Sequence, residues 1–350
     1  MKNELLLSEQ FKKFITACST GRKLGATGKR VTKGTIINYT YAQKLLIDFE
    51  AKYNLKLRIQ LLHRASIRML QKEKNYWSKF YTQFSSFLYN HKGFSDNYVN
   101  NTFKLIKLVF NYLQTDKGYS VGNYHKSFKI PLLKKSPVVL QPSQLHFLIS
   151  EDNFINTLSP TLKKTRDIFV FGCTVALRVS DLIKLKKNNL NYVGNECYLK
   201  LYTQKTGVEV KIPIPDYAID IIEKYKKRAG KYILPRFTIT NFNIQCKELI
   251  KKAGWTYPLP KQISKQGRFV EITNSGGKSW GFHQHITAHT MRRTAITTLL
   301  IMGVAESVVR KISGHAPGSK EFYRYVAIAD EYMNKEVKNA HKKLMETSFQ

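Results

Sequence analysis

Apolar residues recur at helical spacing in three stretches of the first 125 positions. In residues 34–53 they stand four apart, and residues 75–93 form a second stretch, rich in aromatic side chains. Residues 95–114 form a third, which begins at Ser95 or Asp96, both residue types that cap helices. Because side chains three and four apart share a helical face, each stretch predicts a helix with one buried side. The expected apolar faces are Ile37, Tyr41, Leu45 and Phe49 in the first helix, and Val99, Phe103, Ile106, Val109, Phe110 and Leu113 in the third.

The pattern changes after residue 128. Pro131, Pro137 and Pro142 lie close together with lysines between them, which indicates an extended linker. Residues 160–185 are helical in pattern, as one helix or two, and the chain is helical again after Ile286. Period-two alternation predicts strands, so we expect two hairpins. One joins residues 196–203 to 208–214, and the other joins 268–272 to 278–282 across Thr-Asn-Ser-Gly-Gly.

These patterns predict a mainly α protein with small β-hairpins, of the α+β class. We expect five segments: a basic N-terminal segment (1–34), a helical domain (35–128), a linker (129–141), a mixed α and β domain (142–335) and a C-terminal tail (336–350). In the tail, Val337, Ala340, Leu344 and Met345 recur at helical spacing. That apolar face packs either on its own domain or, as we favour, on a neighbouring protomer.

Charge changes the picture most. The 350 residues include 58 Lys and Arg against 24 Asp and Glu, for a net charge of +34. Such an excess predicts a polyanionic partner, of which nucleic acid is the commonest and a membrane surface the alternative. No apolar run is long enough to span a bilayer, and the first ten residues lack the core of a signal peptide, so neither feature is expected.

Cysteine usage and carboxylate spacing predict no metal site and no cofactor. The four cysteines lie far apart in sequence, and no Cys-x-x-Cys or His-x-x-x-His pair is present. Cys173 stands in an apolar run, which favours a buried, reduced thiol.

Four polar residues stand out from this background. Arg178 follows the apolar run 168–177 and needs an anionic partner, either Asp181 one turn away or an external group. His289 and Arg292 are three apart and share a helical face, an arrangement that can hold a phosphate and manage a proton. The alternative for His289 and Arg292 is an ordinary helix face exposed to solvent. Lys205, at a hairpin tip, and His315, after Gly314 at a helix boundary, would each be ordinary alone.

Together, in this order, these residues resemble the tyrosine recombinase (phage integrase) family. The matching motifs are Arg-x-Ser-Asp at 178–181, the hairpin Lys205, His-x-x-Arg at 289–292, Gly-His at 314–315 and a tyrosine near the C-terminus. Within the family the chain resembles integrases of Bacteroides-type mobile elements. The resemblance implies a SAM-like helical core-binding domain and a catalytic domain that form a C-shaped clamp around DNA.

The resemblance also implies the chemistry. Arg178 and Arg292 would grip a phosphodiester, a tyrosine would form a 3′-phosphotyrosine, and Lys205 would protonate the leaving 5′-oxygen. His289 would assist proton transfer, His315 would hold a phosphate oxygen, and Asp181 would orient its neighbours. Double-stranded DNA is the implied partner, bound by a homo-tetramer that assembles from monomers, with DNA-bending accessory proteins. The implied location is the bacterial cytoplasm, at the nucleoid.

The nucleophile departs from the family spacing. Nine residues after His315 stands Arg324, with Tyr323 and Tyr325 on either side. Two positions differ by about 200° around a helix, so only one of the tyrosines can face the protein body. The phase of Phe322, Val326, Ile328 and Ala329 places Tyr325 on that side. Tyr325 is therefore the expected nucleophile and Tyr323 the second choice; alternatively, Tyr325 is a core residue with a hydrogen-bonded hydroxyl.

Two other functions share much of this pattern. A type IB topoisomerase-like nicking–closing enzyme uses the same chemistry, although the short chain and integrase-like first domain disfavour it. A non-catalytic DNA-binding regulator could stand on a recombinase scaffold, although every expected catalytic position is filled here.

Overall fold

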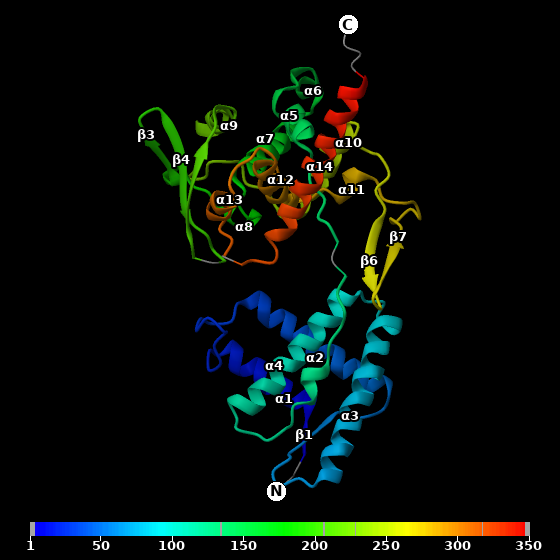
Figure 1. Ribbon diagram of the computed structural model, residues 1–350. Helices are drawn as coiled ribbons and strands as arrows, with labels where there is room; N and C mark the ends of the chain where they lie inside the picture. Colours follow the sequence, from blue (N-terminus) through cyan, green and yellow to red (C-terminus); the bar gives the residue numbers. More distant parts are fainter. Residues whose placement is uncertain (1–3, 134, 206, 228, 317, 347–350) are drawn as a thin grey trace. The chain divides into compact units, whose positions relative to one another are not determined.

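The computed structural model describes residues 4–133, 135–205, 207–227, 229–316 and 318–346. These residues are mainly helical, with small antiparallel sheets, as the sequence predicts (Figure 1). The chain divides into two compact units, which we describe separately. The first comprises residues 1–134 with 262–272, and the second comprises 135–261 with 273–350.

The first unit is a helical domain. Its core consists largely of aromatic rings, among them Trp77, Phe80 and Phe110. Thr32 and Ser66 cap two of its helices by accepting the backbone N–H three residues on. The elements are β1 (Glu4–Leu6), α1 (Leu7–Ser19), α2 (Lys33–Lys52), β2 (Arg58–Gln60), α3 (Ile67–Ser86), a π-helical turn (Phe87–His91), α4 (Asp96–Thr115) and a 3-10 turn (Tyr124–Ser127).

The predicted helical faces are confirmed in α4 and partly wrong in α2. All six predicted apolar positions of α4 are buried. In α2, Leu45 and Phe49 are buried, but Ile37 and Tyr41 are exposed. The buried side there runs through Tyr39, whose ring lies 5.2 Å from that of Phe14 in α1. The packing of α1 against α2 therefore rotates the buried face away from the one that the spacing predicts.

A hairpin from far along the chain completes this unit. Strands β6 (Lys261–Lys265) and β7 (Arg268–Ile272) pair across Gln266 and Gly267, both with positive φ. The predicted pairing of 268–272 with 278–282 is therefore wrong, because this tight turn joins β7 to the preceding strand. Asp96 at the start of α4 receives the hairpin. Its buried carboxylate accepts hydrogen bonds from the Ser264 hydroxyl and from the backbone N–H groups of Gln266 (2.7 Å) and Gly267 (3.1 Å).

The second unit packs helices against a three-stranded antiparallel sheet, which lies at one edge of the unit (Figure 1). Its sheet has the order β3-β4-β5, and the predicted hairpin of 196–203 with 208–214 is confirmed, with Cys197 opposite Ile214 and Tyr202 opposite Glu209. The elements are α5 (Pro142–Ser150), α6 (Asp152–Thr157), α7 (Pro160–Val175), α8 (Val179–Leu182), a 3-10 turn (Lys187–Asn189), β3 (Leu190–Val193), β4 (Glu196–Tyr202), β5 (Glu209–Ile214), α9 (Asp216–Lys226), α10 (Ile239–Lys252), α11 (Phe282–His285), α12 (Ala288–Ile301), α13 (Glu306–Ser313) and α14 (Tyr323–Glu346).

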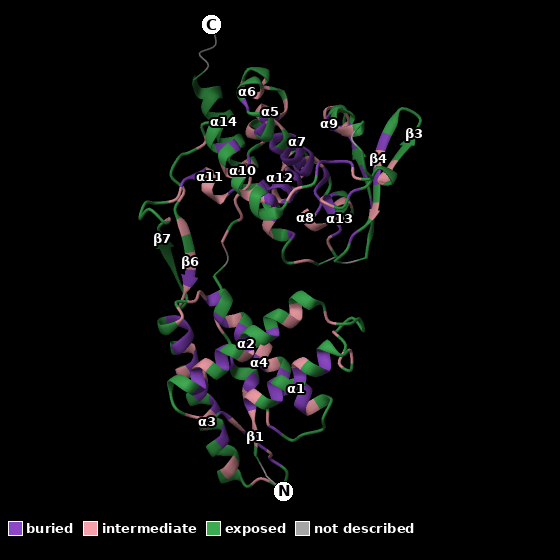
Figure 2. Ribbon diagram, turned by 180° about the vertical axis from the view of Figure 1, so that it is seen from behind, coloured by how far each residue is buried: buried purple, intermediate pink, exposed green. Residues whose placement is uncertain are grey.

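Helix α12 is the centre of this unit. It packs against α7 on one side and α14 on another, and Figure 2 shows α7 and α12 buried over most of their length. The core contains Cys173 and Cys246, and all four cysteines are buried and free. Burial raises the pKa of the Cys173 thiol well above its usual range, which favours the protonated form.

Candidate active site

The site forms where α7 ends against α12. A Cβ at Gly172 would collide with Met291 of α12, so the glycine allows the two helices to approach closely. Helix α7 then stops at Ala176, whose φ of 55° lies in the left-handed region that residues with a Cβ rarely adopt. This turn leads directly to Arg178, the N-cap residue of α8. The end of α7, the start of α8 and the middle of α12 therefore meet in one place.

Arg178 keeps its charge available at this junction. Its Nη1 is buried without a hydrogen-bond partner, and within the described parts of the chain it forms no ion pair. The pair with Asp181 that the sequence left open is not formed, because Asp181 Oδ1 instead accepts the backbone N–H of Gln204 at 3.0 Å. A buried guanidinium N–H without a partner is costly, and an anionic ligand would satisfy it.

Arg292 lies beside Arg178 and is only 2% exposed. Its Nη1 donates to the carbonyl of Ala176 at 2.8 Å, so the strained turn after α7 fixes the orientation of the guanidinium. Burial, and after it the charge of Arg178, lowers the pKa of Arg292 to about 10. A buried guanidinium whose charge is destabilised in this way, next to a second arginine, forms a strong site for an anion.

His315 joins this pair through a chain of hydrogen bonds. Its Nε2 lies 3.0 Å from Nη2 of Arg292, and its Nδ1 lies 2.8 Å from the hydroxyl of Ser313, which donates to Val309 O at 2.6 Å. Because Arg292 can only donate, we assign the neutral tautomer with the proton on Nδ1. Burial and the charges of Arg292 and Arg178 lower the pKa of His315 to about 3.

His289 lies one turn before Arg292 on α12 and has an exposed side chain. Partial desolvation of the ring, followed by the charges of Arg293 and Arg292, lowers its pKa to about 4. Because the side chain is exposed, desolvation contributes less to this shift than it would in a buried residue. The two adjacent arginines lower the pKa in any case. His289 is thus neutral near pH 7 and able to accept a proton.

Lys205 lies in the exposed turn between β4 and β5, as predicted. No contact of its side chain with the arginines is found among the described residues. Two contacts of neighbouring residues nevertheless join its turn to the site. Gln204 is bonded to Asp181, and buried Thr203 lies against Gly314, where a Cβ would come within 3.3 Å of the threonine methyl. The structure thus brings Arg178, Arg292 and His315 together, whereas Lys205 is linked to them only through the neighbouring residues of its turn.

The two tyrosines have opposite environments. Tyr325 is 2% exposed, with its ring 6.0 Å from that of His315, while Tyr323 is 52% exposed. Burial raises the pKa of Tyr325, and the charges of Arg292 and Arg293 oppose that rise. The predicted helical phase is therefore confirmed. Within the part of the chain that the structure describes, no hydrogen bond to the Tyr325 hydroxyl is found, so the reading of a core tyrosine with a bonded hydroxyl has no support.

Arg310 is a neighbour of the site that the sequence did not reveal. Its guanidinium lies over the rings of Phe322 (4.1 Å) and Tyr323 (4.7 Å), and its buried Nη1 has no hydrogen-bond partner. Its charge also contributes to the lowered pKa of His315. In the sequence, Arg310 resembles any basic residue at the end of a helix. Its place near the site becomes visible only in the structure, where the start of α14 lies next to α13.

In the described ranges, no three or more His, Cys, Asp or Glu side chains are grouped so that they could hold a metal ion. No helix in those ranges is long and apolar enough to cross a membrane.

The family model of the phage integrase family matches residues 139–331. Among curated proteins, tyrosine recombinase XerD of Lacticaseibacillus casei is 26% identical over 195 residues, which cover 54% of this chain and 59% of that protein. XerD of Staphylococcus saprophyticus is 24% identical over 198 residues, or 55% and 60% of the two chains. The chain thus spans about three fifths of the length of the curated relatives that it matches.

Solved structures show the same fold at low identity. A lambda integrase dimer bound to a COC′ core site matches with a TM-score of 0.59 and 13% identity, over 92% of this chain and 77% of that one. The Tn1549 transposon integrase in complex with circular intermediate DNA matches with 0.57 and 16%, over 92% and 95%. XerH recombinase bound to a palindromic difH substrate matches with 0.58 and 13%, over 95% of each chain.

Proposed function

Since the chain belongs to the phage integrase family of tyrosine recombinases, we propose that it is a site-specific DNA recombinase that cuts and rejoins strands through a 3′-phosphotyrosyl intermediate. The observation that carries the proposal is the pair of buried Arg292 and half-buried Arg178. Among the described residues this pair has no carboxylate partner, and it lies near Tyr325, whose hydroxyl has no hydrogen-bond partner there. A phosphodiester is the ligand that this combination fits, because guanidinium groups bind phosphate oxygens in a bidentate fashion.

In the proposed reaction, the Tyr325 oxygen attacks the phosphorus. The new oxygen–phosphorus bond replaces the bond to the 5′-oxygen, which leaves with a proton from Lys205. Arg178 and Arg292 stabilise the negative charge that grows on the non-bridging oxygens. Neutral His289 accepts the tyrosine proton. The phosphotyrosine conserves the energy of the broken bond, so a second 5′-hydroxyl can restore the backbone without ATP, and the arginines supply the charge that a metal would otherwise provide.

His315 must change state in this scheme. A phosphate oxygen accepts hydrogen bonds, whereas Nε2 of His315 itself accepts one from Arg292. To hold the phosphate, the imidazole therefore moves its proton to Nε2 or gains a second one. The phosphate charge favours the second course, because a nearby anion raises the pKa of a histidine.

The test is a suicide substrate that carries a nick and traps the cleaved state. In excess EDTA, we expect a covalent complex with protein on the 3′ end. A requirement for metal, or protein on the 5′ end, would refute the mechanism. Transfer of the trapped strand to a second duplex separates a recombinase from a nicking–closing enzyme, which reseals only its own strand.

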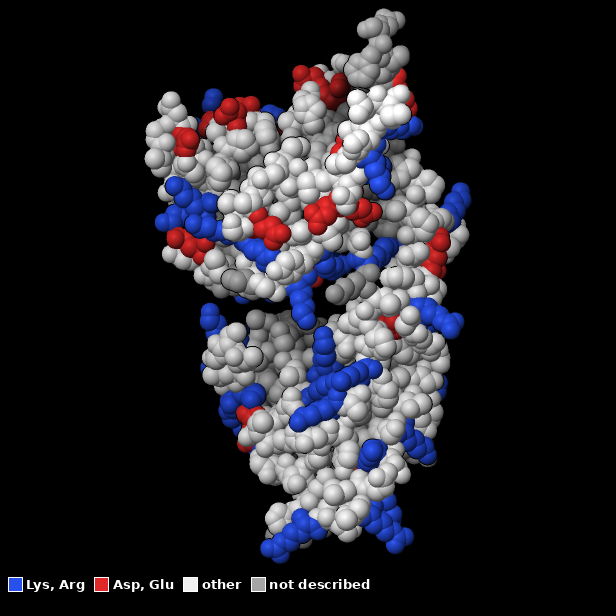
Figure 3. Space-filling view, in the orientation of Figure 1, with Lys and Arg blue, Asp and Glu red and all other residues white. Residues whose placement is uncertain are grey.

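We propose double-stranded DNA as the partner, met in the bacterial cytoplasm at the chromosome. The net charge of +34 supports this, and Figure 3 shows Lys and Arg side chains over the visible face of each unit. Phosphate contacts would then supply most of the affinity. With six to ten of them, binding should weaken by about 10³–10⁵-fold between 50 and 200 mM salt.

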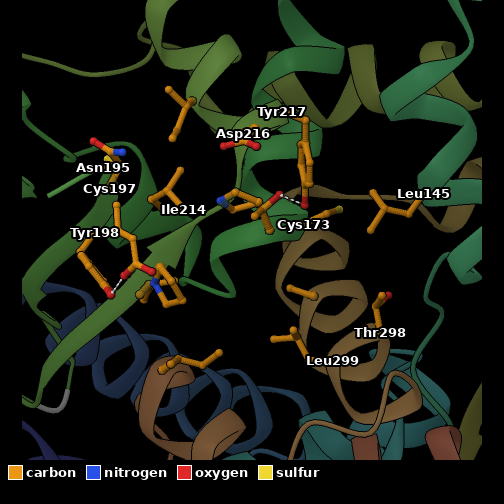
Figure 4. A pocket seen from close by; sticks show the side chains of 18 residues that line it. Leu145, Cys173, Asn195, Cys197, Tyr198, Ile214, Asp216, Tyr217, Thr298 and Leu299 are labelled. Carbon is orange, nitrogen blue, oxygen red and sulfur yellow. Dashed lines mark hydrogen bonds between the residues drawn. The ribbon is translucent and has the colours of Figure 1, made fainter. Parts of the chain in front are cut away.

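We further propose that a neighbouring protomer receives the C-terminal half of α14, as part of a tetramer on two duplexes. Of this helix only Tyr325 and Ala329 are buried, whereas Met333, Val337, Leu344 and Met345 are exposed. The same unit offers an open pocket of about 590 Å³, and Figure 4 shows Leu145, Ile214 and Leu299 on its walls. An apolar helix face and an apolar pocket on one chain fit a head-to-tail exchange between copies.

Removal of residues 335–350 tests this assembly. We expect the pairing of two duplexes to be lost while single-site DNA binding stays within about threefold. Equal loss of both activities would mean that the tail packs on its own unit and is needed for folding.

A further inference from the structure

The turn that carries Lys205 needs support to act in catalysis. Lysine has a long, flexible side chain, and a general acid must come within hydrogen-bond reach of the leaving oxygen. Strand pairing ends at Tyr202 and Glu209, so Lys205 lies beyond the sheet. Thr203 closes the base of the turn, since its N–H donates to Val208 O at 2.9 Å and its carbonyl accepts from Gly207 N–H at 2.8 Å. These bonds shape the turn but do not aim it at the arginines.

Gln204, the residue before Lys205, makes the contacts that aim the turn. Its backbone N–H donates to Asp181 Oδ1 at 3.0 Å, and its Nε2 donates to the carbonyl of Ser180 at 3.1 Å. Its Oε1 accepts from Lys184 Nζ at 2.9 Å. All three partners belong to the segment that begins with Arg178, so one residue fixes the lysine turn to the phosphate-binding arginine.

The amide group suits both side-chain partners. Ser180 offers a carbonyl, which needs a donor, and Lys184 offers an ammonium group, which needs an acceptor. A glutamate at position 204 would keep the contact with Lys184 and set two acceptors against each other at Ser180. A methionine would keep the length of the side chain and lose both bonds, while the backbone bond to Asp181 would remain in either variant.

We propose that Gln204 is the positioning residue for Lys205: its side chain holds the turn so that the ammonium group meets the leaving 5′-oxygen. The proposal rests on the assigned role of Lys205 as general acid. The alternative is that this exposed glutamine only solvates the turn, in which case its replacement would not change cleavage. The particular consequence of the proposal is that Gln204 matters only for a leaving group that needs a proton.

The experiment compares two suicide substrates, one with the ordinary 5′-oxygen and one with a 5′-phosphorothiolate, whose sulfur leaves without protonation. For Gln204→Met we expect cleavage of the ordinary substrate to slow by about 10- to 100-fold, the range caused by a small misplacement of a catalytic group. Cleavage of the phosphorothiolate and DNA affinity should stay within about twofold of the parent protein. Gln204→Glu should fall between the two.

Two controls accompany these variants. Val208→Ala, an exposed position in the same turn, should leave both cleavage rates unchanged. Lys205→Ala should show a larger defect on the ordinary substrate and full rescue by the phosphorothiolate. If Lys205→Ala is rescued but Gln204→Met slows both substrates equally, or neither, the positioning role is overturned and the proposed function stands. If Lys205→Ala is not rescued, the general-acid assignment itself fails.

Discussion

Nη2 of Arg292 lies 3.0 Å from Nε2 of His315 and 3.2 Å from its Nδ1, so the guanidinium and the imidazole are in direct contact. Under the proposed function, a phosphate that binds His315 would displace this contact, and the imidazole would then change from acceptor to donor. The protonation of the His315 imidazole would therefore change when a phosphate binds.

The first prediction concerns pH and stability. The folded pKa of His315 is about 3 and that of buried His125 about 4, both below the usual value near 6.5. A depressed pKa means that the unfolded state binds the proton more tightly, so the stabilisation is complete above pH 6.5 and is lost as the pH falls. Linkage sets the loss at up to about 2 kcal/mol per histidine at pH 5.

Thermal unfolding between pH 7.5 and 5 measures this effect. We expect His315→Asn and His125→Asn each to flatten the fall of Tm with acidification. Because the net charge also opposes folding at low pH, the comparison with the parent protein isolates the histidines. A variant slope equal to the parent slope would contradict the assignment.

The second prediction identifies the nucleophile. Tyr325→Phe should form no covalent adduct with a suicide substrate and should still bind DNA, because only a hydroxyl without a described partner is removed. Tyr323→Phe should form the adduct, since its exposed ring lies under Arg310 at the rim. The opposite result would transfer the role to Tyr323, and adducts from both variants would exclude this helix from the chemistry.

The third prediction separates chemistry from folding at Arg178. Its Nη1 has no partner, so Arg178→Ala should leave Tm nearly unchanged. Cleavage should fall by about 10²–10³-fold or more, the usual cost of removing a donor to a developing oxyanion. DNA affinity should change little, because one phosphate contact among many is lost. Arg236→Ala, at an exposed arginine of the same unit, is the matched control and should leave cleavage intact.

The fourth prediction concerns Asp96, which binds the β6–β7 hairpin. Burial alone would raise the pKa of Asp96, but hydrogen bonds from Ser264, Tyr89, Gly267 and Gln266 outweigh it and lower the pKa. Asp96→Ala leaves several of these donors without a partner. We expect a loss of stability of about 2–4 kcal/mol, as for other broken buried networks, and faster tryptic cleavage after Lys265 and Arg268.

Asp152→Asn serves as the control, since Asp152 also lies in the first turn of a helix but is exposed. That variant should match the parent protein in both measurements. Slow cleavage of the hairpin in Asp96→Ala would show that other contacts hold it in place.

Much of this molecule follows from local pattern. The apolar stripe of α4, the hairpin of β4 and β5 and the inward side of α14 at Tyr325 were predicted from periodicity, because burial repeats with the geometry of the element. The helix boundary predicted at Gly314 and His315 is also confirmed, since Gly314 adopts the left-handed conformation that ends α13.

The missed features depend on contacts between distant segments. Nothing near Asp96 in the sequence indicates that a strand 168 residues away will bind there. The turn at Gln266 and Gly267 carries a weaker turn signal than Thr-Asn-Ser-Gly-Gly, which drew the predicted hairpin to the wrong partner. The left-handed turn at Ala176 likewise depends on the close crossing of α7 and α12.

The hairpin gives the first unit a discontinuous chain. Residues 262–272 pack with residues 1–134 although residues 135–261 of the second unit separate them in sequence. A single cut in the linker would therefore leave two fragments that still recognise each other, because the later fragment carries the strands that seat on Asp96 of the earlier one. Two co-expressed fragments, residues 1–134 and 135–350, should therefore purify together.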